Sequence, residues 1–269
     1  MKSSDRNVWW FFVIAFGFTW VFQIPRTLDS REIIESPQFL LFLARHLPQL
    51  GPFVAAFLLT YLSDGWGGLT RLLRRGWDAR FGMIWWIPIL LLLPAMEGLA
   101  VLLARLFGSE AFPELVIFTQ PRSYAVVLLG LLYLAALEEY GWRGYALDRL
   151  QKKWNALASS LILAAFWGPW HLQQWIMEGA FRPTVPFGAF WYGILMQAIL
   201  LTWLYNNTRA SLLPVILFHT MLNAQVFPTW ESPESTVIFV SIWTLVTVAV
   251  IVLWGPRKLS RRRLASTDR

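Results

Sequence analysis

The sequence contains no cysteine, few charged residues and only three histidines. The absence of cysteine excludes disulfide bonds, thiolate metal sites and cysteine-nucleophile chemistry. Charged residues make up 14% of the 269-residue chain, whereas about a quarter is usual for a soluble domain. Hydrophobic residues make up 57% of the chain, and the mean hydropathy is +0.49. The composition therefore predicts an integral multi-pass membrane protein.

The formal net charge of +7 comes from basic residues that stand in short clusters between apolar runs. A nucleic-acid-binding protein would carry them along one face or stripe. We therefore expect no nucleic-acid partner, and we interpret the clusters as contacts with the lipid bilayer. The segment 68–77, G-L-T-R-L-L-R-R-G-W, alternates leucine and arginine, which predicts a short helix at the membrane surface.

Long apolar runs divide the chain into candidate membrane spans of about 20 residues each. Eight such runs predict an all-α bundle of about eight transmembrane helices, at 8–25, 38–62, 83–107, 123–150, 155–176, 187–207, 210–227 and 236–255. The second contains Arg45, His46 and Pro48 early on, so we expect it to begin at the interface and to cross from about Leu50. The sequence shows no repeat, low-complexity segment or long linker, which predicts a single integral-membrane domain over residues 1–269.

Lysine and arginine concentrate on one side of these eight spans. Lys2 and Arg6 precede the first span, and the basic tail 257–269 follows the last. Most acidic residues of the connecting segments, including Glu110 and Glu231, fall on the other side. Because cytoplasmic segments carry the excess of Lys and Arg, the distribution predicts that both termini are cytoplasmic.

Two adjacent carboxylates and an arginine interrupt the fourth span, in the stretch Y-L-A-A-L-E-E-Y-G-W-R-G-Y-A-L from Tyr133 to Leu147. Each charged side chain near the centre of a membrane helix costs roughly 2.5 to 3.5 kcal/mol on insertion. Glu138, Glu139 and Arg143 therefore need partners or a function. Arg143 is four residues from Glu139 and shares its helix face, so we predict that these two pair and that Glu138 has no intrahelical cation.

Two later spans carry further residues of catalytic type. His171 stands in F-W-G-P-W-H-L, and His219 and Asn223 stand in F-H-T-M-L-N. A rise of about 1.5 Å per residue places Glu138, His171 and His219 roughly 18, 24 and 15 Å from the cytoplasmic ends of their spans. Residues four apart share a face, which groups His219 with Asn223 and Trp167 with His171. The pattern predicts one polar cavity near mid-membrane.

Small residues beside these motifs favour close helix approach or local kinking, namely Gly141, Gly144, Gly168 and Pro169. Two other polar residues have structural rather than catalytic interpretations. We interpret Glu97 in the third span as structural, and His46 as hydrogen-bonded to a neighbouring helix.

Hydrolysis of a peptide bond needs an activated water molecule and donors for the oxyanion that forms. Glu138 with His171 suits the first task, and His219 or Asn223 suits the second. Two histidines and one glutamate are also a catalytic zinc set, so a divalent metal such as zinc on Glu138, His171 and His219 is a competing mechanism. The sequence does not decide between the two mechanisms; we expect a metal-assisted protease, with a metal-free enzyme as the alternative. The motifs H-E-x-x-H and G-x-S-x-G are absent, as is an aspartate pair within the spans.

In order, these motifs resemble the signature of the CPBP family of intramembrane endopeptidases, which includes the type II CAAX prenyl endopeptidases. That signature is E-E-x-x-x-R, then F-x-x-x-H, then H-x-x-x-N. The first motif reads E-E-Y-G-W-R and the third H-T-M-L-N, whereas the second has Trp167 in place of phenylalanine. The resemblance covers about 100 residues, from Tyr133 to Phe227, within a signature core of about 123–227.

The resemblance implies an eight-helix core with a polar cavity open to the cytosol and the membrane. It makes Glu138 the base that activates water, with His171 assisting, and His219 and Asn223 the groups that stabilise the oxyanion. Glu139 stands beside them in the catalytic set, with Arg143 and Trp167 in support. The implied substrate is a membrane-attached protein or peptide of the CAAX type, prenylated in the type II enzymes.

A non-catalytic membrane protein is the alternative. A transporter, or a scaffold protein of the bacteriocin-immunity type, would keep buried polar residues for a solute path or for packing. The absence of an inverted repeat argues against a transporter.

Overall fold

The computed structural model describes residues 3–109, 115–177, 186–229 and 232–261, and these residues contain helices and no β-strand. The predicted all-α fold is therefore confirmed. The longer helices are α1 (Ser3–Ser30), α2 (Gln38–His46), α3 (Gly51–Arg75), α4 (Trp86–Leu106), α6 (Pro121–Gly141), α8 (Ala156–Trp170), α10 (Phe187–Asn207), α11 (Leu213–Ala224) and α12 (Pro233–Trp254).

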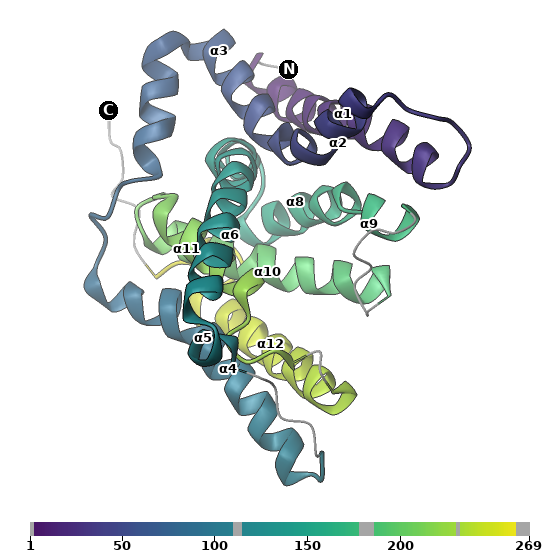
Figure 1. Cartoon of the computed structure of the whole chain (residues 1–269). Helices are drawn as coiled ribbons and strands as arrows, with labels where there is room; N and C mark the ends of the chain where they lie inside the picture. Colours follow the sequence, from purple (N-terminus) through teal and green to yellow (C-terminus); the bar gives the residue numbers. More distant parts are fainter. Residues whose placement is uncertain (1–2, 110–114, 178–185, 230–231, 262–269) are drawn as a thin grey trace, which may run out of the picture.

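Helix α6 lies in the middle of the bundle (Figure 1). It packs against α3 and α11, while α10 packs against α8 and α12 against α4. Figure 1 shows α1, α2 and α3 on one side of α6 and α4 with α12 on the other. This arrangement brings the fourth, fifth and seventh predicted spans, which carry the catalytic-type residues, to the centre.

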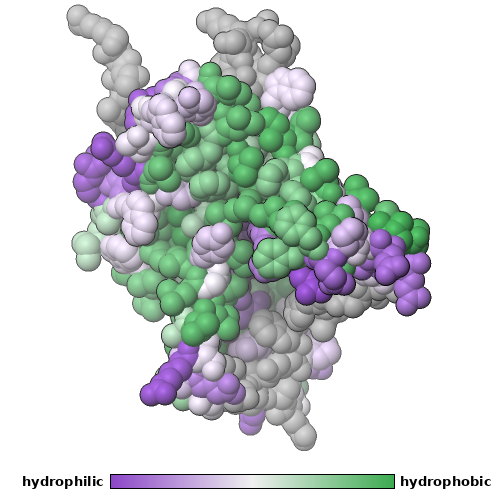
Figure 2. All heavy atoms as spheres, turned by 45° about the horizontal axis from the view of Figure 1, so that its top comes forward, coloured by the Kyte–Doolittle hydropathy of each residue, from purple (hydrophilic) through white to green (hydrophobic). Residues whose placement is uncertain are grey.

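Five helices among the described residues are long and apolar enough to cross a membrane. A sixth is added if α2 and the segment Pro48–Arg75, which meet at a 40° bend, count as one broken span. Large apolar side chains lie exposed along these helices, and Figure 2 shows hydrophobic residues over much of one face. The chain is an integral membrane protein, but the expected count of about eight full spans is not confirmed.

The expected count differs because two apolar runs contain helices that are too short. Helix α8 has 15 residues and α11 has 12, which correspond to about 22 and 18 Å against the roughly 30 Å of a bilayer core. Pro169 stands in the last turn of α8, and α11 ends where Gln225 adopts a left-handed φ of 40°. Counting apolar residues along the sequence does not show where a helix ends.

Helix α3 contains a break at Gly65, whose φ of 61° and ψ of −160° are not helical. The helix before the break starts at Gly51, after the short 3₁₀ turn η1 (Pro48–Leu50), close to the predicted crossing point. The part after the break forms a separate arm that carries Arg71 and Arg74 on its exposed surface (Figure 1). The predicted helix over residues 68–77 is present up to Arg75, whereas its place at the membrane surface stays a prediction.

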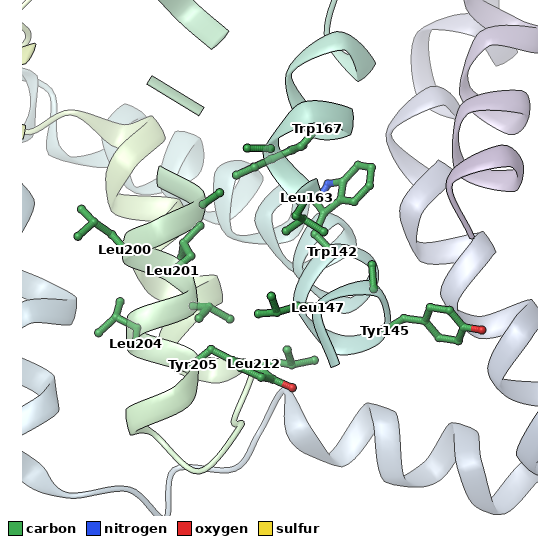
Figure 3. Packing of buried hydrophobic residues seen from close by; sticks show 14 of the residues in the cluster. Trp142, Tyr145, Leu147, Leu163, Trp167, Leu200, Leu201, Leu204, Tyr205 and Leu212 are labelled. Carbon is green, nitrogen blue, oxygen red and sulfur yellow. The ribbon is translucent and has the colours of Figure 1, made fainter. Parts of the chain in front are cut away.

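Helix α6 continues into η3 (Trp142–Leu147), a segment of π-helix, and then into α7 (Asp148–Leu150). π-helical turns are rare in proteins, and those that occur often lie at functional sites. All six residues of η3 are buried. Figure 3 shows Trp142 and Leu147 beside side chains of α8 and α10, among them Leu163 and Leu204. Tyr145 points the other way and stacks on Phe11 of α1 with ring centroids 5.5 Å apart. The wide turn therefore lies in the hydrophobic core.

A polar cluster holds the end of η3. The Arg75 guanidinium donates to the Gly144 carbonyl at 3.0 Å, to Asp148 Oδ2 at 2.8 Å and to the Ala210 carbonyl at 3.0 Å. The Tyr205 hydroxyl bonds to both Arg75 and Asp148. These contacts join α3, η3, α10 and the segment before α11, and they satisfy the Gly144 carbonyl within the π-helical segment.

The predicted close approaches at glycine are confirmed. A Cβ atom on Gly141 would lie 2.5 Å from the Cβ of Pro52, and one on Gly168 would lie 2.2 Å from Cδ1 of Trp191. A side chain at Gly141 would meet the Pro52 backbone, and one at Gly168 would displace the Trp191 ring. These two glycines set the distance of α6 from α3 and of α8 from α10.

Candidate active site

The buried ion pair of the site joins Glu139 and Arg143. Arg143 Nη1 donates to Glu139 Oε1 at 2.7 Å, and both side chains are completely buried. This confirms the pairing predicted from their spacing. His219 on α11 also contacts the same oxygen, with Nδ1 at 2.8 Å. Because a carboxylate accepts only, His219 carries its proton on Nδ1 and Nε2 is the nitrogen left for other partners.

Glu138 has a different environment from Glu139. Its Oε2 accepts hydrogen bonds from the indole nitrogens of Trp167, at 2.7 Å, and Trp142, at 3.3 Å. The Glu138 residue is 8% exposed, whereas Glu139 is fully buried. Two neutral donors on one oxygen orient the carboxyl group without neutralising its charge. The sequence reasoning missed Trp142, although its spacing of four residues from Glu138 was a usable signal.

Trp167 connects the carboxylate to both histidines. Its indole donates to Glu138, and its ring centroid lies 5.4 Å from that of His219 and 6.3 Å from that of His171. The Arg143 guanidinium carbon lies 4.2 Å from the ring centroid, which is a cation–π distance. A phenylalanine, which the family signature has at this position, would keep the ring contacts and lose the hydrogen bond.

His171 lies just beyond α8, at its C-cap. Its Nδ1 is 3.0 Å from the Trp167 carbonyl, which can only accept, so the proton stands on Nδ1 and Nε2 is unprotonated in the neutral ring. The Trp170 and Phe190 rings pack edge-on against it at centroid distances of 4.7 and 5.2 Å. The ring is partly buried, and it lies within electrostatic range of Glu138 and His219.

Asn223 stands one turn beyond His219, in the last turn of α11. His219 is 3% exposed, whereas Asn223 is exposed. The structure therefore gathers the two glutamates, the two histidines, Arg143 and Trp167 in the interior, and it places Asn223 at the edge of this group.

The expected metal ligands do not form a ligand group in this arrangement. Among the described residues, no three His, Asp or Glu side chains are placed to hold one ion. Glu138 Oε2 is engaged by two indoles, and His219 Nδ1 is engaged by Glu139. The side chains as they stand in the described residues do not fit a divalent metal.

The expectation that His46 bonds to a neighbouring helix is wrong, because its partner lies within its own helix α2. Its Nδ1 lies 2.8 Å from the Phe42 carbonyl, and its ring packs on Phe42 at 4.5 Å. Glu97 is buried and meets the backbone that follows α11, at Phe227. The sequence reasoning found no partner for Glu97 because that partner comes from another segment.

The centre of this apolar helical bundle thus holds an acid, two histidines and a buried ion pair, which are groups that a hydrolase can use. The comparisons make this class specific. Residues 120–225 match the family described as type II CAAX prenyl endopeptidase Rce1-like. These residues include every candidate site residue.

A relative supports the same assignment over nearly the whole chain. The chain is 26% identical over 261 residues to CAAX prenyl protease 2 of Methanococcus maripaludis. The match covers 94% of this chain and 96% of that protein. The protein is therefore an intramembrane endopeptidase.

Proposed function

We propose that this endopeptidase cleaves a peptide bond near the C-terminus of a membrane-attached, prenylated protein of the CAAX type, with water activated by Glu138. The name of the archaeal relative supports this class of substrate. The role of Glu138 rests on the observation that the two carboxylates have different hydrogen-bond partners. Arg143 pairs with Glu139, whereas the hydrogen bonds to Glu138 come from neutral indoles.

Activation of water requires a base within reach of it. In our proposal, the Glu138 carboxylate takes a proton from water as the water oxygen attacks the scissile carbonyl carbon. The unprotonated Nε2 of His171 accepts a second hydrogen bond from the same water and orients it. The proton on Glu138 then passes to the leaving amine, so that the carboxylate is restored.

The oxyanion of the tetrahedral intermediate needs hydrogen-bond donors. His219 Nδ1 is committed to Glu139, so Nε2 is the nitrogen that would meet the oxyanion, and it donates there when the ring carries both protons. The exposed amide of Asn223, one turn away, would supply a second donor. Glu139 and Arg143 hold the His219 ring in place.

The membrane supplies the second half of substrate recognition. A prenyl chain partitions into the hydrocarbon, so a prenylated substrate and the enzyme meet within one bilayer. We further propose that both termini are cytoplasmic, as the distribution of basic residues indicates. The cleaved segment would then enter from the cytoplasmic side.

The test uses purified protein and two reporter peptides that differ only in a prenyl group on the CAAX cysteine. We expect the wild type to cleave the prenylated peptide, and Glu138→Gln to cleave neither. Glu234→Gln, which alters an exposed glutamate in the first turn of α12, is the matched control and should retain full activity. Equal cleavage of both peptides would contradict prenyl recognition, and cleavage by Glu138→Gln would contradict the assigned base.

A further inference from the structure

Helix α4 carries a buried carboxylate that the proposed reaction does not use. Glu97 is 1% exposed and lies within a candidate membrane span. An isolated charge at such a depth is costly, so a glutamate there is expected to have a partner and a task. Its Oε2 accepts a hydrogen bond from the backbone N–H of Phe227 at 3.2 Å, and the N–H of Val226 also donates to this carboxyl group.

Those two amides belong to the turn that ends α11. The helix stops at Ala224, and Gln225 then adopts a left-handed conformation with φ of 40° and ψ of 89°. A residue other than glycine is uncommon at positive φ, and the conformation persists only where the surroundings determine it. The Glu97 carboxyl group supplies that determinant, because it accepts from the two amides directly after Gln225.

The contact with α4 extends beyond the hydrogen bonds. A Cβ atom on Gly98 would lie 3.5 Å from the Phe227 ring, so the ring packs directly over the backbone of α4. Helices α4 and α11 are also packed against each other. Glu97 therefore connects α4 to the end of α11.

Asn223 stands two residues before this left-handed turn. The direction of a side chain in the last turn of a helix depends on where that helix ends and on how its final residues are held. We infer that Glu97 is a positioning residue for the reaction, which fixes the end of α11 and through it the Asn223 amide. This inference rests on the proposed role of Asn223 as an oxyanion donor.

The experiment compares two substitutions of Glu97. Glu97→Gln keeps a side-chain oxygen that accepts from the amides, and we expect its kcat to stay within about threefold of the wild type. Glu97→Leu removes the acceptor, and we expect kcat to fall by about 10- to 100-fold with little change in KM, the cost of a displaced catalytic group. Met96→Leu is the control, since Met96 is a buried neighbour on α4 that packs toward Phe239 instead.

A double-mutant cycle separates positioning from a structural role. Asn223→Ala alone should lower kcat by roughly 100-fold. If Glu97 acts through Asn223, Glu97→Leu causes no further loss in that background. A full additional loss would overturn the inference, because a structural effect multiplies that of Asn223→Ala. Unchanged kcat in Glu97→Leu would overturn it as well.

The activity of Asn223→Ala tests the proposed oxyanion role of Asn223 separately. Full activity of Asn223→Ala would reject that role whatever the Glu97 variants do. If Glu97→Leu does not yield folded protein, Glu97→Asp takes its place in the same cycle. The shorter side chain withdraws the carboxyl group from the two amides, so a smaller loss of kcat is expected, and again none in the Asn223→Ala background.

Discussion

The indole nitrogen of Trp167 donates to a carboxylate oxygen of Glu138 at 2.7 Å, across the contact between α8 and α6. We predict that Trp167→Phe folds and lowers kcat by about tenfold. The substitution preserves the ring contacts with His219 and Arg143 and removes one hydrogen bond to a charged group, worth about 1.5 to 3 kcal/mol. Steady-state cleavage of the prenylated reporter gives kcat. Unchanged kcat would mean that Trp142 alone orients the carboxylate.

The two histidines give the second prediction. His171→Ala and His219→Ala should each abolish cleavage while the protein remains folded, because His171 orients the attacking water and His219 donates to the oxyanion in the proposed reaction. Activity is measured together with thermal unfolding in detergent. His46→Ala is the control, since His46 is exposed and bonded within α2. Retained cleavage by the His219 variant would remove its oxyanion role.

Topology is the third prediction. Reporter fusions at Glu110 and Glu231, which lie outside the described residues, should report the non-cytoplasmic side if both termini are cytoplasmic. Fusions at the termini should report the opposite side. A cytoplasmic signal at Glu110 or Glu231 would contradict the predicted orientation.

The fourth prediction concerns the divalent metal. We expect cleavage to persist after chelation, because the described side chains of Glu138, His171 and His219 do not form a three-ligand group. Chelator treatment of the purified enzyme, followed by elemental analysis, measures this. Loss of activity that zinc restores, with about one zinc ion per chain, would establish the metal mechanism instead.

Local spacing predicted much of the site. The separation of four residues between Glu139 and Arg143 predicted their pairing, and that between Trp167 and His171 predicted their proximity. These relations lie within one helix or at its end, where geometry follows from the sequence. The amino-acid composition directly predicted an integral membrane protein.

The shared depth of Glu138, His171 and His219 could be predicted, but the individual contacts between helices could not. The contact of His219 with Glu139 and that of Glu97 with Phe227 each depend on how two helices pack. The π-helical turn that starts at Trp142 is held by tertiary contacts, including the bond from Arg75 to Gly144. Hydropathy counted α8 and α11 as full spans because it records apolar residues rather than helix ends.

The last prediction separates the adjacent glutamates. Arg143 donates to Glu139 and is fully buried, and its Nε and Nη2 have no hydrogen-bond partner among the described residues. Glu139→Gln therefore leaves the guanidinium buried without an opposite charge on its bonded oxygen, which costs about 3 to 5 kcal/mol. We expect both thermal stability and cleavage to fall, and Arg143→Gln to destabilise in the same way.

Glu138→Gln should behave differently, because Trp142 and Trp167 donate to an amide oxygen as well as to a carboxylate. It should eliminate cleavage and leave the unfolding temperature nearly unchanged, since the hydrogen-bonded ion pair of Arg143 with Glu139 is kept. Reporter cleavage and thermal unfolding are measured for the three variants, with Glu234→Gln as control. Together they distinguish the catalytic base from the supporting carboxylate. If Glu138→Gln turned over substrate while Glu139→Gln lost cleavage at full stability, Glu139 would be the base and Glu138 its support.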